Sequence, residues 1–230
     1  MADQLVSVIV PVFAGERFLG DALDSVAAQT YPRVETIVVD DGSPDRSVEI
    51  ATGRPGVRVL HGPHRGVAAA RNSGLSAARG ELIAFLDQDD QWQPSKLARQ
   101  AAVLAERSAV DIVLSHMEMT LVAGTPRPSW FEPAWLTSPQ PGYVPSTWLV
   151  RREAFERVGP FDTSYEIACD SDWLTRAKDG GLASEMLADV LVRWRVHGAN
   201  GSYDQATMRR EMFRMLRGTA GRQREAGRAG

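Results

Sequence analysis

The chain has 230 residues, of which 43% are hydrophobic and 24% are charged, enough for one large domain or two small ones with an ordinary core. The formal net charge of -3 argues against a general nucleic-acid binder, whose affinity would rest on a basic face. The single cysteine, Cys169, excludes an internal disulfide and a zinc site built from cysteines, and it fits a reducing compartment.

The opening segment, MADQLVSVIVPV, is apolar but has neither a basic leader nor a small-residue cleavage site, which argues against a signal peptide. No run of residues approaches the roughly 20 apolar positions of a membrane span. We therefore expect a soluble, cytoplasmic protein.

The first half of the chain alternates short apolar runs with segments of helical periodicity. Residues 5–12, LVSVIVPV, form a β-branched run that is typical of a strand buried on both faces. Ser43 is expected to cap a helix whose first residue is Pro44, and Gly80 is expected to end another. The same reasoning predicts further strands over 34–39 and 57–61, and helices over 18–28 and 67–78.

The next predicted strand, 82–86, is followed by three carboxylates within four positions, in the stretch FLDQDDQW. An acidic pair follows the strand over 34–39 in the same way. Strands that alternate with helices predict an α/β domain, and ligands of such domains bind beyond the carboxyl ends of the strands. We therefore expect five carboxylates at one sheet edge: Asp40, Asp41, Asp87, Asp89 and Asp90.

Neighbouring carboxylates repel one another, and a divalent cation between them removes that repulsion. Oxygen ligands with few protein contacts suit Mg²⁺ or Mn²⁺ holding a substrate diphosphate. The alternative is a solvated acidic turn before a helix that begins near Pro94, because Asp favours helix entries.

Two common nucleotide sites are excluded by the residues that follow the first strand. Residues 13–17, FAGER, supply neither GxGxxG nor GxxxxGK[ST]. The acidic groups would then act through base or ribose contacts and through a metal, with Arg65 and Arg71 as candidates to offset diphosphate charge. The alternative for both arginines is an ordinary place on a surface helix or loop.

These motifs occur in an order that resembles family 2 glycosyltransferases. The stretches SVIVPVFAGERFLGDALDSVAAQTYPRVETIVVDDGSPD and GVAAARNSGLSAARGELIAFLDQDDQW are similar to the nucleotide-sugar half of that family, densely so across residues 5–110. The resemblance implies the GT-A fold, with a mostly parallel central sheet flanked by helices. It also implies inverting transfer from a nucleoside diphosphate sugar, with a UDP-sugar favoured and with Mn²⁺ or Mg²⁺ as cofactor.

The resemblance assigns roles by motif position. Asp41 matches the residue that contacts the donor base, and Asp89 matches the metal ligand of the DxD pair. Asp87 lies nearer the ribose and diphosphate. Donor-nucleotide binding is thereby implied for Pro11, Val12, Asp40, Asp41, Arg71, Asp87 and Gln88.

The second half of the chain is less regular. Strands are expected over 111–121 and 144–150, separated by a Pro-rich segment that carries Trp130, Phe131 and Trp135. These aromatics are either core plugs or a platform on which a sugar or aglycone stacks.

Residues 169–176, CDSDWLTR, are expected to open a helix, with Asp170 as a plausible cap. The segment resembles the family's Glu-Asp pattern, whose Asp is the catalytic base, so the resemblance implies that role for Asp170. Cys169 stands where that family has Glu, which places the hydrogen bonding around the base in question. Asp172 is expected to orient the helix or the acceptor.

Residues 190–197, VLVRWRVH, alternate as a strand does and precede GANGS. They resemble the family's RxHxxNxS closing segment, which implies that His197 contacts the metal or the diphosphate; the alternative is a capped structural histidine. Residues expected on the acceptor side or in support of the site are Trp148, Asp172, Trp173 and Arg195.

Beyond Tyr203, methionines and arginines alternate in the pattern of a basic amphipathic helix, and residues after Gly218 are expected to fray. Such a helix packs on its own domain or on a sister subunit in a homodimer, or it meets an anionic membrane surface at the inner face. The expected organisation is a donor half over 1–121, an acceptor-binding and catalytic half of the same domain over 122–203, and a basic helix and tail over 204–230.

The acceptor could be a saccharide, a lipid carrier, a peptide or a small molecule, and no nucleic-acid partner is expected. Two other functions remain open. The chain could be a nucleotide-sugar binding scaffold without catalysis, for which Ala14, Arg65 and Cys169 are the only support. It could also be a sugar-phosphate nucleotidyltransferase, although the Gly-rich loop of that class is missing after the first strand.

Overall fold

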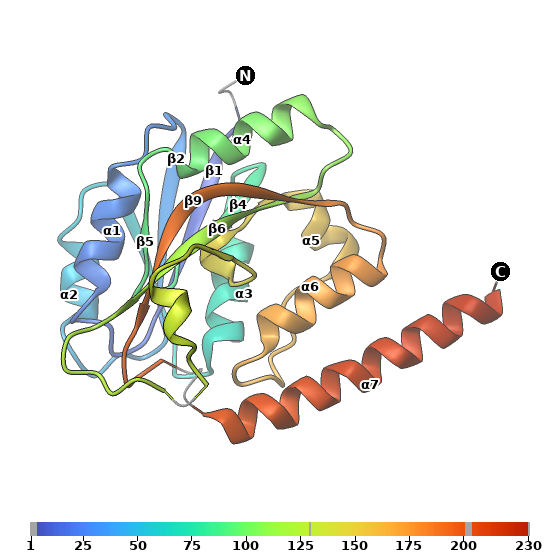
Figure 1. Cartoon of the computed structure of the whole chain (residues 1–230). Helices are drawn as coiled ribbons and strands as arrows, with labels where there is room; N and C mark the ends of the chain where they lie inside the picture. Colours follow the sequence, from blue (N-terminus) through green and yellow to red (C-terminus); the bar gives the residue numbers. More distant parts are fainter. Residues whose placement is uncertain (1–3, 129, 201–203, 230) are drawn as a thin grey trace.

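The computed structural model describes residues 4–128, 130–200 and 204–229, with side chains described up to residue 222 (Figure 1). The strands are β1 (Val6–Val12), β2 (Val34–Asp40), β3 (Val57–His61), β4 (Leu82–Phe85), β5 (Gln91–Trp92), β6 (Ile112–Leu121), β7 (Gln140–Pro141), β8 (Leu149–Arg151) and β9 (Ser184–Val196). The helices are α1 (Leu19–Ala27), α2 (Ser47–Thr52), α3 (Val67–Ala77), α4 (Lys96–Glu106), α5 (Arg152–Val158), α6 (Cys169–Asp179) and α7 (Gln205–Ala229), with 3-10 turns η1 (Pro133–Leu136) and η2 (Pro145–Thr147).

The strands of these residues form a single mixed sheet in the order β3-β2-β1-β4-β8-β6-β9-β5, with β7 paired to β6 at the side. The stretch β3-β2-β1-β4 is parallel, as predicted from alternating strands and helices. All seven residues of β1 are buried, which fits a central strand covered on both faces.

The remaining strands make the sheet mixed. β8 runs antiparallel to both β4 and β6, whereas β9 runs parallel to β6. The two-residue strand β5 lies antiparallel to β9, with Gln91 opposite Arg193 and Trp92 opposite Val192. This pairing brings the residues that follow the acidic stretch against the strand that leads to His197.

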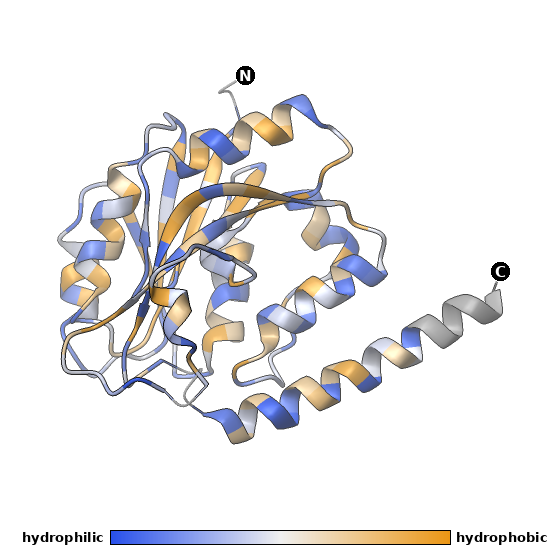
Figure 2. Cartoon of the chain, viewed as in Figure 1, coloured by the Kyte–Doolittle hydropathy of each residue, from blue (hydrophilic) through white to orange (hydrophobic). Residues whose placement is uncertain are grey.

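Helices cover both faces of the sheet, and each face has its own apolar core. One core contains Leu19 of α1 and Leu97 of α4, and the other contains Ala70 of α3, Phe155 of α5 and Trp173 of α6. Figure 2 shows hydrophobic residues concentrated on the central strands, whereas hydrophilic and hydrophobic residues alternate along α7. None of the helices in the described ranges has both the length and the apolar character needed to cross a membrane.

Two predictions about helix ends are wrong, each for a steric or hydrogen-bonding reason. The helix after β2 begins at Ser47, and Ser43 instead accepts a hydrogen bond from the Ala14 N–H at 3.1 Å. α3 ends at Ala77, and Gly80 is needed because a Cβ there would lie 2.4 Å from the Leu5 carbonyl oxygen.

The strand expected over 144–150 is also only partly present. Residues 145–147 form the turn η2, and strand pairing begins at Leu149. Pro145 has no N–H to donate to a ladder, which accounts for the late start. Farther on, α7 continues to Ala229 instead of fraying after Gly218, and Arg222 ties it to Asp179 of α6 at 2.9 Å.

The aromatic residues of the Pro-rich segment act as core plugs. Phe131 is 3% exposed, and Trp130 and Trp135 pack around it. Trp130 also lies 6.4 Å, centroid to centroid, from Trp194 of β9. These three side chains therefore do not form an exposed platform for stacking.

Candidate active site

The five predicted carboxylates lie at the carboxyl ends of β2 and β4, on one edge of the sheet. Val12 of β1 pairs with Asp40 of β2, and the Asp41 N–H donates to the Val12 carbonyl at 2.8 Å. Asp87 follows the end of β4, which is the other parallel neighbour of β1. The sequence prediction of one acidic sheet edge is therefore confirmed.

Asp41 organises the loop before α3. Its carboxylate accepts hydrogen bonds from the Arg65 N–H at 2.9 Å and the Gly66 N–H at 2.8 Å. Gly66 has a φ of 88°, a conformation that favours glycine. The Nδ1 of His64 lies 2.9 Å from the same carboxylate. Asp41 is only 6% exposed, so these contacts fix both its position and that of the loop.

An aromatic pair lies beside Asp41 that the sequence did not reveal. The ring of Phe13, which follows β1, stacks on the ring of His64 with their centroids 4.0 Å apart and their planes at 26°. Phe13 is 41% exposed, which is unusual for a large apolar side chain at a sheet edge. The pair is a flat, partly exposed surface of the kind on which a nucleobase stacks.

Four other residues predicted to bind the donor nucleotide lie next to Phe13 and Asp41. The side-chain amide of Gln88 accepts a hydrogen bond from the Phe13 N–H at 2.9 Å and donates one to the Phe13 carbonyl at 3.0 Å. Asp40 is 5% exposed and accepts from the Ser43 N–H at 3.1 Å. Pro11 and Val12 are buried in β1. These four residues hold Phe13 and Asp41 in place.

Arg71 is buried at the centre of the site, with 4% of its surface exposed. Its guanidinium donates to Asp87 at 2.7 Å and to the Cys169 sulfur at 3.4 Å. Burial disfavours the charged form, but Asp87, Cys169 and Asp170 outweigh it and raise the pKa of Arg71. Its buried Nε atom has no hydrogen-bond partner among the described residues. Arg71 is thus an internal positive charge shared by the DxD loop and α6.

Asp89 is bound by residues that follow β9. Its Oδ2 lies 2.8 Å from His197 Nε2 and accepts a hydrogen bond from the Asn200 side chain at 2.9 Å. The Ala199 N–H donates to the other ring nitrogen of His197, Nδ1, at 3.3 Å. Residues 201 and 202, the end of the predicted closing segment, lie outside the described residues.

Arg195 supports Asp89 from the backbone side. Its guanidinium binds the Asp89 carbonyl oxygen and pairs with Asp21 of α1 at 2.7 Å. It also lies 4.7 Å from the ring centroid of Phe18. Arg195 therefore joins α1, β9 and the acidic stretch, and it holds Asp89 in position.

Asp90 differs from its neighbours because it is completely buried. Burial, with the charges of Asp89 and Asp87, raises the pKa of Asp90 well above the usual range of an aspartate. Ser146 donates to its carboxyl group at 2.6 Å and accepts from the Asp87 N–H at 3.1 Å. Ser146, a residue that sequence reasoning missed, thus joins Asp87 to the buried Asp90 and stabilises the segment 87–90.

Within the part of the chain that the structure describes, no three His, Cys, Asp or Glu side chains converge on a common point as a metal would require. Asp89 and His197 are two adjacent ligand groups, and the carboxylate is the one that suits Mn²⁺ or Mg²⁺ when other oxygens complete the shell. Mg²⁺ is commonly bound in this way, through one or two carboxylates together with substrate phosphates and water. The residues present therefore fit a metal that is shared with a bound diphosphate.

Asp170 lies in the first turn of α6, on the other side of Arg71. The N-cap position is Ala168, so the predicted capping role of Asp170 is wrong. Its carboxylate accepts from the Ser171 N–H at 2.6 Å. Burial raises the pKa of Asp170, and the charge of Arg71 opposes that rise. A partly buried carboxylate with a raised pKa is suited to accept a proton.

The other residues of this region are supporting ones. Asp172 is 5% exposed and pairs with Arg176 at 2.8 Å, which orients α6. Trp148 and Trp173 are completely buried and pack together with ring centroids 5.7 Å apart. Burial prevents the two tryptophans from stacking on an acceptor, so they support the backbone around the site.

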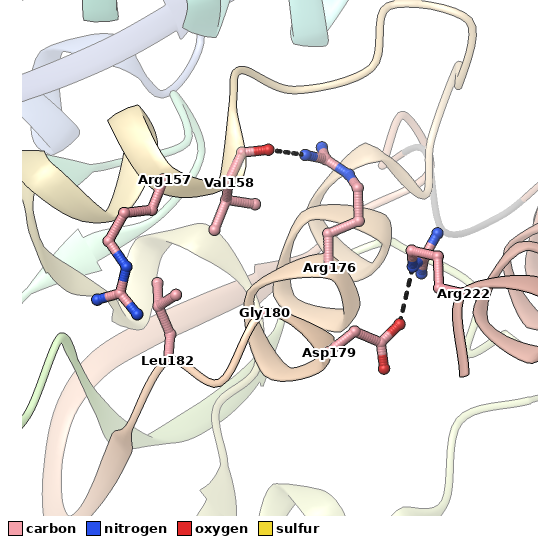
Figure 3. A pocket seen from close by; sticks show the side chains of 7 residues that line it. All are labelled: Arg157, Val158, Arg176, Asp179, Gly180, Leu182 and Arg222. Carbon is pink, nitrogen blue, oxygen red and sulfur yellow. Dashed lines mark hydrogen bonds and ion pairs between the residues drawn. The ribbon is translucent and has the colours of Figure 1, made fainter. Parts of the chain in front are cut away.

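A separate pocket of about 320 Å³ lies at the far end of α6 (Figure 3). Asp170 is about 13 Å from that end, at 1.5 Å per helical residue. Two arginines that line the pocket already have partners: Arg176 donates to the Val158 carbonyl at 2.9 Å, and Arg222 pairs with Asp179. None of the residues that line this pocket belongs to the acidic sheet edge. The lining residues are Arg157, Val158, Arg176, Asp179, Gly180, Leu182 and Arg222.

Comparison with known proteins gives consistent matches. The model of glycosyl transferase family 2 matches residues 7–159. An uncharacterized glycosyltransferase of Nostoc sp. is 32% identical over 219 residues, which cover 88% of this chain and 68% of the relative. The glycosyltransferase AglE of Haloferax volcanii is 32% identical over 199 residues, which cover 81% of this chain and 65% of the relative.

Solved structures share the fold. TarS 1–349 of S. aureus in complex with UDP-GlcNAc has a TM-score of 0.71 at 22% identity, with 87% of this chain and 61% of that chain covered. The mannosyltransferase PcManGT of Pyrobaculum calidifontis, in complex with GDP-Man and Mn²⁺, has a TM-score of 0.64 at 22% identity, with 87% and 59% covered. The chain thus spans about three fifths of these two solved proteins.

Proposed function

The chain belongs to glycosyl transferase family 2, and we propose that it moves a sugar from a nucleoside diphosphate sugar to an acceptor hydroxyl with inversion. The observation that carries this proposal is the convergence of three groups on one sheet edge. They are the Phe13–His64 pair with Asp41, the Asp89–His197 pair, and Asp170 across the buried Arg71.

The donor base binds against Phe13 and His64 in this proposal, with Asp41 beside it. Stacking on an aromatic face contributes binding energy for any base, and a carboxylate that accepts from base N–H groups adds selectivity. Asp87 lies next to the ribose and diphosphate. A UDP-sugar is favoured, although TarS is solved with UDP-GlcNAc and PcManGT with GDP-Man.

Asp89 and His197 would hold Mn²⁺ or Mg²⁺ together with the donor diphosphate. When bound, the metal supplies positive charge that stabilises the leaving diphosphate. Arg195 keeps Asp89 in place through its carbonyl oxygen, and Asn200 orients the Asp89 carboxylate.

Asp170 acts as the general base. It takes the proton of the acceptor hydroxyl as that oxygen bonds to the anomeric carbon, and the sugar–oxygen bond to the diphosphate breaks with its electron pair on the diphosphate. The attack comes from the face opposite the leaving group, so one displacement inverts the configuration. The raised pKa of Asp170 makes it a stronger base than an exposed aspartate.

A binding subunit without catalysis is the second candidate. The observation that favours it is Cys169 beside Arg71, whose buried Nε has no partner in the described residues. Family membership makes nucleotidyl transfer a poorer alternative. The acceptor, in this proposal a saccharide, a lipid carrier, a peptide or a small molecule, reaches Asp170 beside the segment 122–148.

We also propose that the outer face of α7 contacts an anionic membrane surface. Its exposed residues recur at the spacing of one helical face. Phe213 is 68% exposed and Leu216 56%, and the charges on this face are arginines. A two-fold homodimer through the same face would bring like charges together, so we favour the membrane. The face consists of Ala206, Arg209, Arg210, Phe213, Leu216, Arg217 and Ala220.

Two carboxylate variants test the catalytic proposal by release of nucleoside diphosphate from a panel of donors and acceptors. We expect Asp89→Ala to lose metal-dependent donor binding. We expect Asp170→Asn to keep donor binding and to lower kcat by about 10²- to 10⁴-fold. Asp24→Asn, on the exposed side of α1, is the control. Wild-type turnover in Asp170→Asn would exclude this residue as the base.

A further inference from the structure

The residues that lead into α6 are held by a side chain of another helix. Its N-cap residue, Ala168, has no side chain that could accept a hydrogen bond, and α6 has no side-chain cap of its own. The carboxylate of Glu211, on α7, instead binds the N-cap residue and the two residues before it. Its Oε1 accepts from the Glu166 N–H at 2.7 Å, and its Oε2 accepts from the Ile167 N–H at 3.0 Å and the Ala168 N–H at 2.9 Å.

Glu211 is inside the protein, with 4% of its surface exposed. Burial opposes its ionisation, but the hydrogen bonds from Ala168, Glu166 and Ile167 outweigh burial and lower the pKa of Glu211. An ionised carboxylate near the N-terminal end of a helix is also favoured by the helix dipole. The contact is therefore charged and strong at neutral pH.

The backbone bound by Glu211, residues 166–168, ends two residues before Asp170. The Asp170 carboxylate accepts a hydrogen bond from the next residue, Ser171, so this bond fixes it only relative to its own backbone. The position of the carboxylate in the site then depends on residues 166–168. In the described chain the carboxylate that holds those residues comes from α7, which runs along α6 in Figure 1.

We propose that Glu211 is a positioning residue for the general base, and that α7 is thereby part of the active-site architecture. The inference rests on the proposed role of Asp170. α7 lies beyond residues 7–159, to which the family model matches. Glu211 itself contacts neither donor nor acceptor. It positions Asp170 through the backbone of residues 166–168.

Glu211→Gln is the most direct variant because it keeps the size of the side chain. The amide oxygen still accepts, but the amide nitrogen cannot, so at least one of the N–H donors loses its partner. We expect kcat to fall about 100-fold, since small displacements of a catalytic group have effects of that size, while donor affinity is unchanged. Glu211→Asp retains the charge on a shorter side chain and is expected to recover part of the kcat.

Arg222→Met is the matched control. It removes another contact between α6 and α7, the ion pair with Asp179, at the opposite end of α6. We expect it to lower thermal stability but to leave kcat unchanged. If Arg222→Met lowers kcat as much as Glu211→Gln at a matched loss of stability, the effect is general loosening of α7 and the positioning role is wrong.

Amide hydrogen exchange, measured by NMR on the full chain, tests the same inference without turnover. Glu211→Gln should accelerate exchange at the N–H groups of residues 166–168, whereas Arg222→Met should leave them protected. Unchanged protection in Glu211→Gln, or unchanged kcat while Asp170→Asn is inactive, would overturn the inference alone. An inactive wild type, or an active Asp170→Asn, would instead contradict the proposed function.

Discussion

At the level of single residues, the proposed reaction depends most on the environment of Asp170. Burial disfavours its ionised form and raises its pKa, and the charge of Arg71 limits that rise. A general base must be ionised, so kcat falls as the pH drops through the raised pKa. The acidic limb of the kcat profile should therefore lie above the ordinary aspartate value of roughly 3.9.

Replacing Arg71 tests the cause of that pKa. Arg71→Met removes the positive charge beside Asp170, so the acidic limb should move to higher pH in the residual activity. Arg176→Met is the control, because Arg176 pairs with Asp172 in the same helix. A limb that moves equally in both variants, or in neither, would show that Arg71 does not set the pKa of the base.

Motifs predicted some of the site residues but not those that hold them. Asp87 and Asp89 were recognisable because their spacing after a buried strand is a local pattern, and the structure places them at the expected edge. Phe13 and His64, whose rings stack, are far apart in the sequence. Glu211 and residues 166–168 are similarly distant, and a glutamate in an amphipathic helix has no local feature that predicts a contact with the residues before another helix.

At the scale of elements, long buried runs were predicted well and short ones were not. β1, β2, α3 and β6 follow from apolar runs or helical spacing, and their observed ends lie close to the expected ones. β5 and β7 have two residues each, too few to show any periodicity. Their strand character depends on partners that are distant in the chain.

The outer face of α7 gives a prediction at this scale. Arg209 and Arg217 are exposed and have no ion-pair partner among the residues whose side chains are described. Each basic residue near an anionic surface contributes about 1 kcal/mol, so Arg209→Glu with Arg217→Glu should weaken binding to anionic vesicles by roughly 30-fold or more. Sedimentation with phosphatidylcholine vesicles, with and without phosphatidylglycerol, measures the fraction of protein that binds.

The charge-matched control for this experiment changes two arginines elsewhere, Arg46→Glu on the loop that leads into α2 and Arg99→Glu on α4. Phe213→Ser should also weaken binding, because an apolar ring is lost from the face. Equal loss in the control would indicate a simple dependence on net charge. Binding that is the same with and without phosphatidylglycerol would contradict the proposal.

At the scale of the whole molecule, the two halves expected from the sequence share one sheet. β8 and β9 insert beside β4 and β6, so strands from the second half complete the edge that the first half begins. His197 follows β9 and reaches Asp89, while α6 carries Asp170 to the other side of Arg71. The donor and acceptor functions are therefore proposed to meet where the two parts of the sheet join.

Calorimetric binding of UDP and of GDP, each with Mn²⁺ and with EDTA, tests whether this sheet edge holds a metal-dependent donor site. We expect UDP to bind in the presence of Mn²⁺, and both EDTA and Asp89→Ala to weaken that binding, because the diphosphate and Asp89 share the metal. Asp24→Asn should bind as the wild type does. Equal affinity in Mn²⁺ and in EDTA, or no binding of either nucleotide, would contradict a metal-dependent donor site at this sheet edge.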